Sequence, residues 1–255
     1  MSAKSDRYEK DVAAFISESR NVNSYRPQVG TDYPDVIVEY TGSKAGISKE
    51  SVYVEVKMNH TDNLANPRLY YESGKWKTTY TTPVAHTAVR YMNRSTSAKK
   101  WLQGLCKYCK IPFKDLYFPT TFGEYKKGVK AGISPKVSEV IDYVESAGIT
   151  RYLHTTENMN MSDEIIAHYT EGKSAIAHYM GAGDDFYRLS VTNPLKVPTG
   201  VPMLSGKGDF SIRVSTRSEY YEIQVEAKIK KLDSSPYSVK PGTTKKNPFE
   251  HLAKG

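Results

Sequence analysis

The sequence predicts an α/β protein in which a mixed β-sheet is flanked by helices. Residues 33–40 and residues 51–58 each alternate β-branched residues with polar or charged ones, which is the period-2 pattern of half-buried strands. Residues 5–20 carry apolar side chains at helical spacing, so a helix is expected before these strands. Further along the chain, segments with helical spacing alternate with short strand patterns. Helices and strands mixed in this way pack as layers around a sheet.

The helix expected over residues 5–20 has Ser5 as its candidate N-cap. Its apolar stripe consists of Tyr8, Val12, Phe15 and Ile16. Glu9 lies on the flank of this stripe, whereas Glu18 lies further round the helix. Residues 21–32 are polar and contain a proline and a glycine, so they are interpreted as a connector. Glu9 is therefore the carboxylate of this helix that lies nearest to its apolar face.

Residues 33–40 and 51–58 are expected to pair as a hairpin, because two glycines and two lysines lie between them. The pairing places four valines on one face: Val36, Val38, Val54 and Val56. Asp35, Glu55 and Lys57 then share the other face. Strand residues rise about 3.3 Å each, so Glu55 and Lys57 project side by side roughly 7 Å apart. Two carboxylates and a lysine at the open edge of a hairpin make a compact place to hold a divalent cation.

The next part of the chain is predicted to contain a loop, a second hairpin and two helices. The loop covers residues 59–68, the hairpin residues 69–82, and the helices residues 83–93 and 95–110. Ser95 or Thr96 caps the second helix. The two cysteines, Cys106 and Cys109, lie on that helix, and a structural zinc site would need four soft ligands. They are therefore interpreted as small residues that face the core.

Residues 111–132 are irregular and basic, and a helix is expected to follow them. Ser134 is its N-cap, Pro135 its first residue and Gly148 its end. A strand is expected over residues 149–155. Ser162 begins another helix, which is expected to continue, or to be followed by a second helix, through Tyr179.

Three strands and a basic tail complete the chain. The strands are expected over residues 186–191, 210–215 and 220–229. The tail is rich in proline and lysine and is expected to have little to bury, being mobile or draped over the body. The expected segments are a catalytic core in residues 1–110, a helical and β elaboration in residues 111–232 that packs on the core, and the tail in residues 233–255.

The charge balance favours a polyanionic partner. The 255 residues include 36 Lys and Arg against 28 Asp and Glu, which gives a net charge of +8 and a pI near 9.2. A basic surface attracts nucleic acid through phosphate contacts and counterion release. The 20 tyrosines suit stacking on bases or hydrogen bonding to phosphates, as well as packing in a core.

The sequence also predicts a cytoplasmic protein without a membrane partner. The mean hydropathy is -0.58, and no run approaches the roughly 18 apolar residues of a membrane span. Residues 1–10 lack the apolar region of a secretory signal. Because the chain has two cysteines, a framework of disulfides is not expected, and the expected location is a reducing compartment.

The chemistry is expected at a spaced pattern in the first hairpin. Pro34-Asp35, nineteen intervening residues and Glu55-Val56-Lys57 together resemble the PD-(D/E)xK nuclease superfamily, which includes many restriction endonucleases. The resemblance covers roughly the first 60 residues. It implies a restriction-endonuclease-like core, with Asp35 and Glu55 holding Mg²⁺, or Mn²⁺ as a substitute, and the main-chain carbonyl of Val56 as a further ligand. Lys57 would orient or activate the attacking water, and Glu9 would be an accessory carboxylate from the preceding helix.

Elementary chemistry agrees with these implied roles. Hard carboxylate oxygens suit Mg²⁺, which keeps several of its waters. The metal acidifies one water and offsets the charge that develops on the phosphoryl oxygens. A lysine beside the metal acts as a point charge that positions the nucleophile.

A second arrangement of the same type lies near the end of the chain. Asp209 is followed, after sixteen intervening residues, by Glu226-Ala227-Lys228. Glu226 and Lys228 again share one strand face. Asp209, Glu226 and Lys228 are therefore an alternative site, although no proline precedes the aspartate. In the other interpretation, these strands form a substrate-binding lobe, and their carboxylates hold no metal.

These patterns predict a Mg²⁺-dependent DNA endonuclease of the type II restriction kind, with its sequence specificity left open. The residues expected to grip nucleic acid are Arg68, Lys75, Lys77, Lys99, Lys100, Lys126 and Lys127. A homodimer would supply two active sites, one for each strand of a DNA duplex. The alternatives are a non-catalytic DNA- or RNA-binding protein with a basic, tyrosine-rich surface, and an enzyme acting on another phosphoester. No Gly-rich phosphate loop or nucleophile elbow is present, so no nucleotide cofactor and no serine hydrolase are predicted.

Overall fold

The computed structural model of the protein describes residues 3–27, 34–61, 63–118, 134–148, 152–155, 159–171, 175–217 and 220–253. The chain divides into two units. Unit 1 comprises Met1–Asp62, Asn160–Lys207 and Ile229–Gly255, and unit 2 comprises Asn63–Met159 and Gly208–Lys228. Each unit is assembled from segments that are separated in the sequence, whereas the sequence suggested three consecutive segments.

Unit 1 contains a five-stranded mixed sheet. In order across the sheet, its strands are β1 (Val22–Tyr25), β2 (Val36–Tyr40), β3 (Val52–Lys57), β9 (Ala177–Ala182) and β10 (Asp185–Arg188). Strand β1 pairs antiparallel with β2, and β2 pairs antiparallel with β3. Strand β3 then pairs parallel with β9, which pairs antiparallel with β10. The hairpin expected between residues 33–40 and 51–58 and the mixed character of the sheet are thus confirmed.

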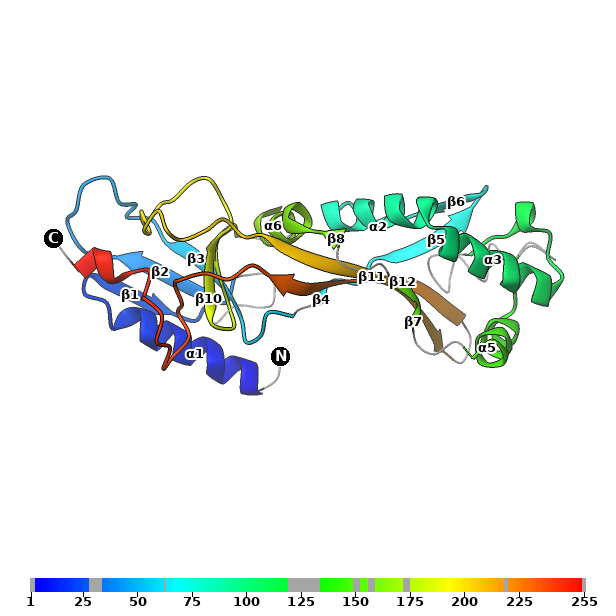
Figure 1. Cartoon of the computed structure of the whole chain (residues 1–255), viewed down its shortest axis with the longest axis horizontal. Helices are drawn as coiled ribbons and strands as arrows, with labels where there is room; N and C mark the ends of the chain where they lie inside the picture. Colours follow the sequence, from blue (N-terminus) through cyan, green and yellow to red (C-terminus); the bar gives the residue numbers. More distant parts are fainter. Residues whose placement is uncertain are drawn as a thin grey trace. The chain divides into compact units, whose positions relative to one another are not determined.

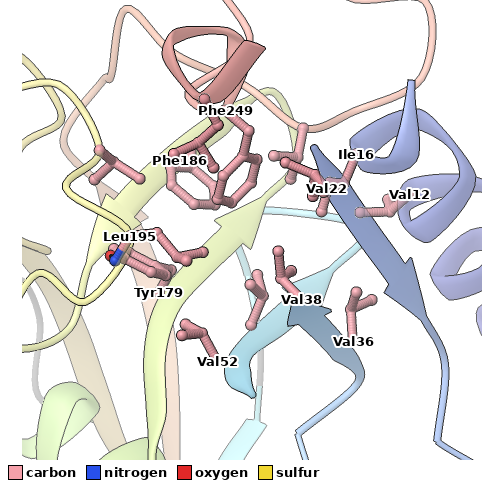
Figure 2. Packing of buried hydrophobic residues seen from close by; sticks show 14 of the residues in the cluster. Val12, Ile16, Val22, Val36, Val38, Val52, Tyr179, Phe186, Leu195 and Phe249 are labelled. Atoms are coloured by element: carbon pink, nitrogen blue, oxygen red, sulfur yellow. The ribbon is translucent and has the colours of Figure 1, made fainter. Parts of the chain in front are cut away.

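One face of this sheet forms the core of unit 1. Val36 of β2 lies opposite Val54 of β3, and both are fully buried. Helix α1 (Ala3–Ser17) runs along β1 and β2 (Figure 1) and packs Val12 and Ile16 into the same cluster. Figure 2 shows these side chains converging from the helix and the strands. The valine face predicted from the alternation is confirmed.

The C-terminal segment completes this core. Phe249 has no exposed surface and lies edge-on to Phe186 of β10, with ring centroids 5.5 Å apart (Figure 2). Leu252, in the short 3-10 helix η2 (Glu250–Ala253), is also fully buried. The expectation that this tail has little to bury is wrong, because three apolar side chains, Val239, Phe249 and Leu252, anchor an otherwise polar segment in the core.

The other face of the sheet carries the polar residues of β3. Because Glu55 aligns with Met180 and Lys57 with Ala182 in the parallel pairing, these four side chains project from the same face. Helix α6 (Ser162–Glu171) contributes the buried side chain of Tyr169 beside Lys57. Glu55 and Lys57 therefore lie on the face opposite to the valine core, as predicted.

A second sheet is antiparallel, and most of its residues belong to unit 2. Its seven strands are β4 (Asn63–Ala65), β5 (Arg68–Glu72), β6 (Lys75–Lys77), β7 (Tyr152–Thr155), β8 (Met159–Asn160), β11 (Gly206–Arg217) and β12 (Tyr220–Leu232). The described helices of unit 2 are α2 (Pro83–Arg94), α3 (Thr96–Cys109), α5 (Val137–Ser146) and the 3-10 helix η1 (Phe113–Asp115). None of the described helices is long and apolar enough to cross a membrane.

Most elements of unit 2 match their predictions. The hairpin of β5 and β6 and the helices α2 and α3 lie where they were expected. Ser95 caps α3 by accepting a hydrogen bond from the N–H of Ala98. Helix α5 is followed by Gly148, whose φ of +63° is the left-handed conformation that favours glycine.

Several predictions differ from the structure. The connector expected over residues 21–32 contains strand β1, and Ser5 lies within α1 rather than at its N-cap. The expected loop over residues 59–68 contains strand β4, which pairs with β12. Helix α5 has Lys136 rather than Ser134 as its N-cap, because the carboxylate of Glu139 accepts the Lys136 N–H at 2.7 Å. The expected helical continuation through Tyr179 is strand β9. That strand is almost continuously buried between β3 and β10, so it lacks the alternation that identifies a half-buried strand.

Candidate metal and catalytic site

Asp35 lies immediately before β2 and reaches across to β3. Its Oδ2 atom accepts the main-chain N–H of Val56 at 2.8 Å. The backbone pairing of β2 with β3 ends at Val36 and Val54, so the side chain of Asp35 supplies the next acceptor of the ladder. Pro34, which is buried, precedes it and restricts the backbone there. The Asp35 carboxylate is thereby held against the middle residue of Glu55-Val56-Lys57.

Glu55 and Lys57 form an ion pair on β3. Glu55 has no exposed surface, and its Oε1 atom lies 2.6 Å from the Nζ atom of Lys57. The Lys57 ammonium also lies 5.4 Å from the ring centroid of Tyr169, a cation–π contact. A buried carboxylate is costly unless it is paired with a cation or binds a metal. The environment of Glu55 therefore favours a positive charge beside it.

Glu9, the carboxylate predicted to assist from the preceding helix, lies on α1, which packs on the valine face of the sheet. It is 5 % exposed and accepts a hydrogen bond from the Nε atom of Arg26, whose Nη2 atom also lies 3.0 Å from Asp6. This hydrogen bond is the main reason that the pKa of Arg26 is raised, and the charges of Glu9, Asp6 and Asp35 add to the effect. Arg26 therefore connects Glu9 electrostatically with Asp35.

Sequence reasoning did not identify Arg26, which follows β1 in the residues interpreted as a connector. An arginine beside a strand end carries no periodic signal of its own. Its partners, Glu9 and Asp6, become neighbours only when α1 packs on β1 and β2. The contact is a property of the folded unit.

The donor set suits a hard divalent cation. Asp35 and Glu55 supply carboxylate oxygens, which are the ligands that Mg²⁺ prefers. Among the residues that the structure describes, no three His, Cys, Asp or Glu side chains are gathered closely enough to hold a metal ion. Lys57 and Arg26 neutralise Glu55 and Glu9 in this arrangement. The carbonyl of Val56 as a further ligand stays a prediction.

The alternative arrangement lies in unit 2, on β11 and β12. Glu226 is 2 % exposed, with its Oε1 atom 3.2 Å from Arg213 Nη1 and its Oε2 atom 3.0 Å from Lys228 Nζ. Both carboxylate oxygens thus face a cation. Asp209 lies on β11 and is partly buried. The structure places Glu226 and Lys228 side by side, as the sequence predicted, and adds an arginine to them.

The basic residues predicted to bind nucleic acid lie in unit 2 where they are described. Arg68 faces Glu222 at 3.4 Å and Lys77 faces Glu72 at 2.8 Å. Lys75 on β6 and Lys99 and Lys100 on α3 are exposed. Lys126 and Lys127 lie outside the described residues. The exposed lysines are accordingly the stronger candidates for phosphate contacts.

A cavity of about 430 Å³ in unit 2 was not predicted from the sequence. Its lining includes three aromatic side chains, Tyr71, Trp76 and Phe113, and two cations, Arg94 and Lys99. Ser95 and Thr96, at the start of α3, complete its edge, and its described lining contains no carboxylate. The cations and the helix N-terminus suit an anionic ligand, whereas Tyr71 and Trp76 are buried and pack against each other.

The two cysteines lie on α3. Burial raises the pKa of the Cys106 and Cys109 thiols to about 11. Cys106 is buried in α3 and Cys109 is partly buried. Their interpretation as residues that pack against the core agrees with these positions.

Comparison with known proteins identifies no relative of this chain: no family model matches it, and no curated protein or solved structure is significantly similar to it.

Proposed function

We propose that the protein is a Mg²⁺-dependent endonuclease that hydrolyses DNA phosphodiester bonds, with its site at Asp35, Glu55 and Lys57. The observation that carries the proposal is the hydrogen bond from the Val56 N–H to the Asp35 carboxylate. It joins the two halves of a pattern that nineteen residues separate in the sequence. A surface hairpin with a Glu–Lys pair would not need a second carboxylate at this position.

The surroundings of these residues support the same proposal. The resemblance to the PD-(D/E)xK superfamily implies a mixed sheet and a carboxylate from the preceding helix. Unit 1 contains a mixed sheet, and α1 carries the buried carboxylate of Glu9. A restriction-endonuclease-like core is therefore our proposal for the sheet of unit 1 and its two helices, α1 and α6.

Each residue has a distinct expected role. Asp35 and Glu55 would hold Mg²⁺ with the Val56 carbonyl, and Glu9 would assist. When bound, Mg²⁺ would lower the pKa of a water and stabilise charge on the phosphoryl oxygens. Lys57, whose ammonium is restrained by Glu55 and the ring of Tyr169, would orient the attacking water. Arg26 would balance the charge of Glu9 before the metal arrives.

Plasmid cleavage tests this proposal directly. Supercoiled plasmid is incubated with the wild-type protein in Mg²⁺, in Mn²⁺ and in excess chelator, and nicked and linear products are resolved on a gel. We expect nicked and linear DNA with either metal and none with chelator. If plasmid, single-stranded DNA and RNA all remain uncut under every metal condition, the proposed nuclease activity is refuted.

A non-catalytic nucleic-acid-binding protein is the second candidate. The aromatic and basic cavity of unit 2 favours it, because its cations and the helix N-terminus suit an anionic ligand without any metal site. The variant Asp35→Asn distinguishes the two functions. The nuclease would lose cleavage and keep its affinity for DNA in a mobility-shift assay, whereas a binding protein would keep every measurable function.

A further inference from the structure

Asp185, at the start of β10 in unit 1, is the centre of a buried polar cluster. The residue is 3 % exposed. Its Oδ1 atom accepts the N–H of Ser235 at 2.6 Å and the ammonium of Lys245 at 2.7 Å. Its Oδ2 atom lies 2.6 Å from the Nε2 atom of His60. Two donors therefore fix this carboxylate, and its second oxygen holds an imidazole.

Strand register places this cluster beside Lys57. Lys57 aligns with Ala182 of β9, and Ala182 aligns with Asp185 of β10. Neighbouring strands are about 4.8 Å apart, so the Cα atoms of Lys57 and Asp185 are separated by about 10 Å. Residues aligned in this way project from one face of the sheet. Asp185 thus shares the face that carries Glu55 and Lys57.

The turn between β9 and β10 brings His60 to the same end of the sheet. The N–H of Gly183 donates to the carbonyl of Lys57 at 2.8 Å. Gly183 has a φ of +57°, and a Cβ atom on it would lie 3.0 Å from the Cδ2 atom of His60. The glycine is required for both the turn and the close approach of the ring. His60, three residues after Lys57, therefore packs beside the catalytic strand.

The exposure of His60 distinguishes it from a structural partner. Its side chain is 41 % exposed, and ion pairs open to solvent contribute little to stability. Asp185 already has a cation in Lys245. A carboxylate beside an imidazole nitrogen sets the orientation of the ring. The Nε2 atom is buried beside Asp185, so the exposure of the side chain belongs to the rest of the ring.

We infer that His60 is the general acid of the proposed hydrolysis and that Asp185 is the residue that positions it. The inference rests on the proposed nuclease function. The oxygen of a water forms a bond to phosphorus and releases one proton to solvent. The bond between phosphorus and the leaving bridging oxygen breaks, and its electron pair stays on that oxygen. That oxygen takes a proton from the His60 imidazolium. Solvent then protonates the neutral imidazole again.

A substrate with a sulfur leaving group tests this step. Two duplexes of one sequence are compared in single-turnover cleavage, one with oxygen and one with sulfur at the leaving bridging position. The ends of the wild-type products show which bridging atom leaves. A thiolate leaves without protonation, whereas an alkoxide benefits from a general acid by about 10²–10⁴-fold.

We expect His60→Ala to cleave the oxygen duplex about a hundredfold more slowly than the wild type, and the sulfur duplex at nearly the wild-type rate. Asp185→Asn should show the same pattern with a smaller loss. His86→Ala, which changes an exposed histidine of α2, is the matched control and should cleave both duplexes normally. Binding of the oxygen duplex by His60→Ala without metal should equal that of the wild type.

Each other outcome has a clear meaning. Equal loss on both duplexes, or no loss on the oxygen duplex, would overturn the role of His60 while the nuclease stands. If Asp185→Asn fails to fold, as judged by circular dichroism, His60→Gln provides the same comparison without touching the buried carboxylate. A wild-type protein that cleaves neither duplex in Mg²⁺ would overturn the nuclease, and this inference with it.

Discussion

Strands β3 and β12 carry the same local pattern in different surroundings. Each has a buried glutamate and, two residues later, a lysine whose ammonium lies within 3.0 Å of the carboxylate. On β12, Arg213 approaches the other oxygen of Glu226. On β3, the residue between Glu55 and Lys57 donates its N–H to the carboxylate of Asp35. The local pattern therefore does not identify a site; the side chains brought to it from other elements do.

Charge balance separates the two regions further. On β12, one carboxylate, Glu226, is matched by two cations. On β3, two carboxylates, Asp35 and Glu55, lie against one cation, Lys57. An excess of carboxylates attracts a divalent cation, whereas an excess of cations repels it. We therefore expect metal-dependent chemistry on β3 and a structural ion network on β12.

The largest expected effect is the difference in cleavage rate between the variants Asp35→Asn and Asp209→Asn. Loss of a metal ligand removes several kcal/mol of transition-state stabilisation, so Asp35→Asn should slow cleavage by at least about a thousandfold. Asp209→Asn should remain within about threefold of the wild type. Single-turnover cleavage of one labelled duplex measures both. The opposite ranking would move the site to β11 and β12.

The two lysines give the second comparison. Lys57→Arg replaces a compact point charge with a planar fork that does not fit the same place, and a misplaced nucleophile costs roughly a hundredfold in rate. Lys228→Arg keeps an ion pair with Glu226 and should leave the rate unchanged. The same duplex assay applies, with metal affinity checked by calorimetry. Equal rates for the two variants would remove Lys57 from the proposed mechanism.

The first hairpin was predictable because its information is local. The valine alternation, the glycines of the connecting loop and the Pro34-Asp35 start all lie within one short stretch. The burial of Val36, Val38 and Val54 follows from that pattern. The pairing of Asp35 with the residue between Glu55 and Lys57 also follows, since strand register places it there.

The remainder of the site depends on contacts that are distant in the sequence. Strand β9 lies beside β3 although a large part of the chain separates them, and its buried sequence lacks alternation. His60 is polar and lies in a stretch with no periodicity, so its meaning depends on Asp185 and Lys245. Phe249 is an isolated aromatic residue in a polar segment. Such partners are chosen by packing, which a single sequence does not display.

Stability measurements sharpen the comparison further. Glu226→Gln removes a charge that two cations share, and hydrogen bonds to charged groups contribute about 2 kcal/mol, so the free energy of unfolding should fall by about that amount. Glu55 is paired with one cation, Lys57, so the loss for Glu55→Gln should be smaller, at about 1 kcal/mol. Urea denaturation in chelator gives both values. A larger loss for Glu55→Gln would indicate that Glu55 has a structural role.

The smallest expected effect is the stabilisation that Mg²⁺ itself provides. A ligand at ten times its Kd raises the free energy of unfolding by about 1.4 kcal/mol when it binds the folded state alone. Wild type and Glu226→Gln should show this rise, Glu55→Gln should not, and Glu9→Gln should need more Mg²⁺ to reach it. Urea denaturation at a series of Mg²⁺ concentrations measures the effect without any substrate. An equal rise in Glu55→Gln would place the bound metal elsewhere and leave β3 without the ion that distinguishes it from β12.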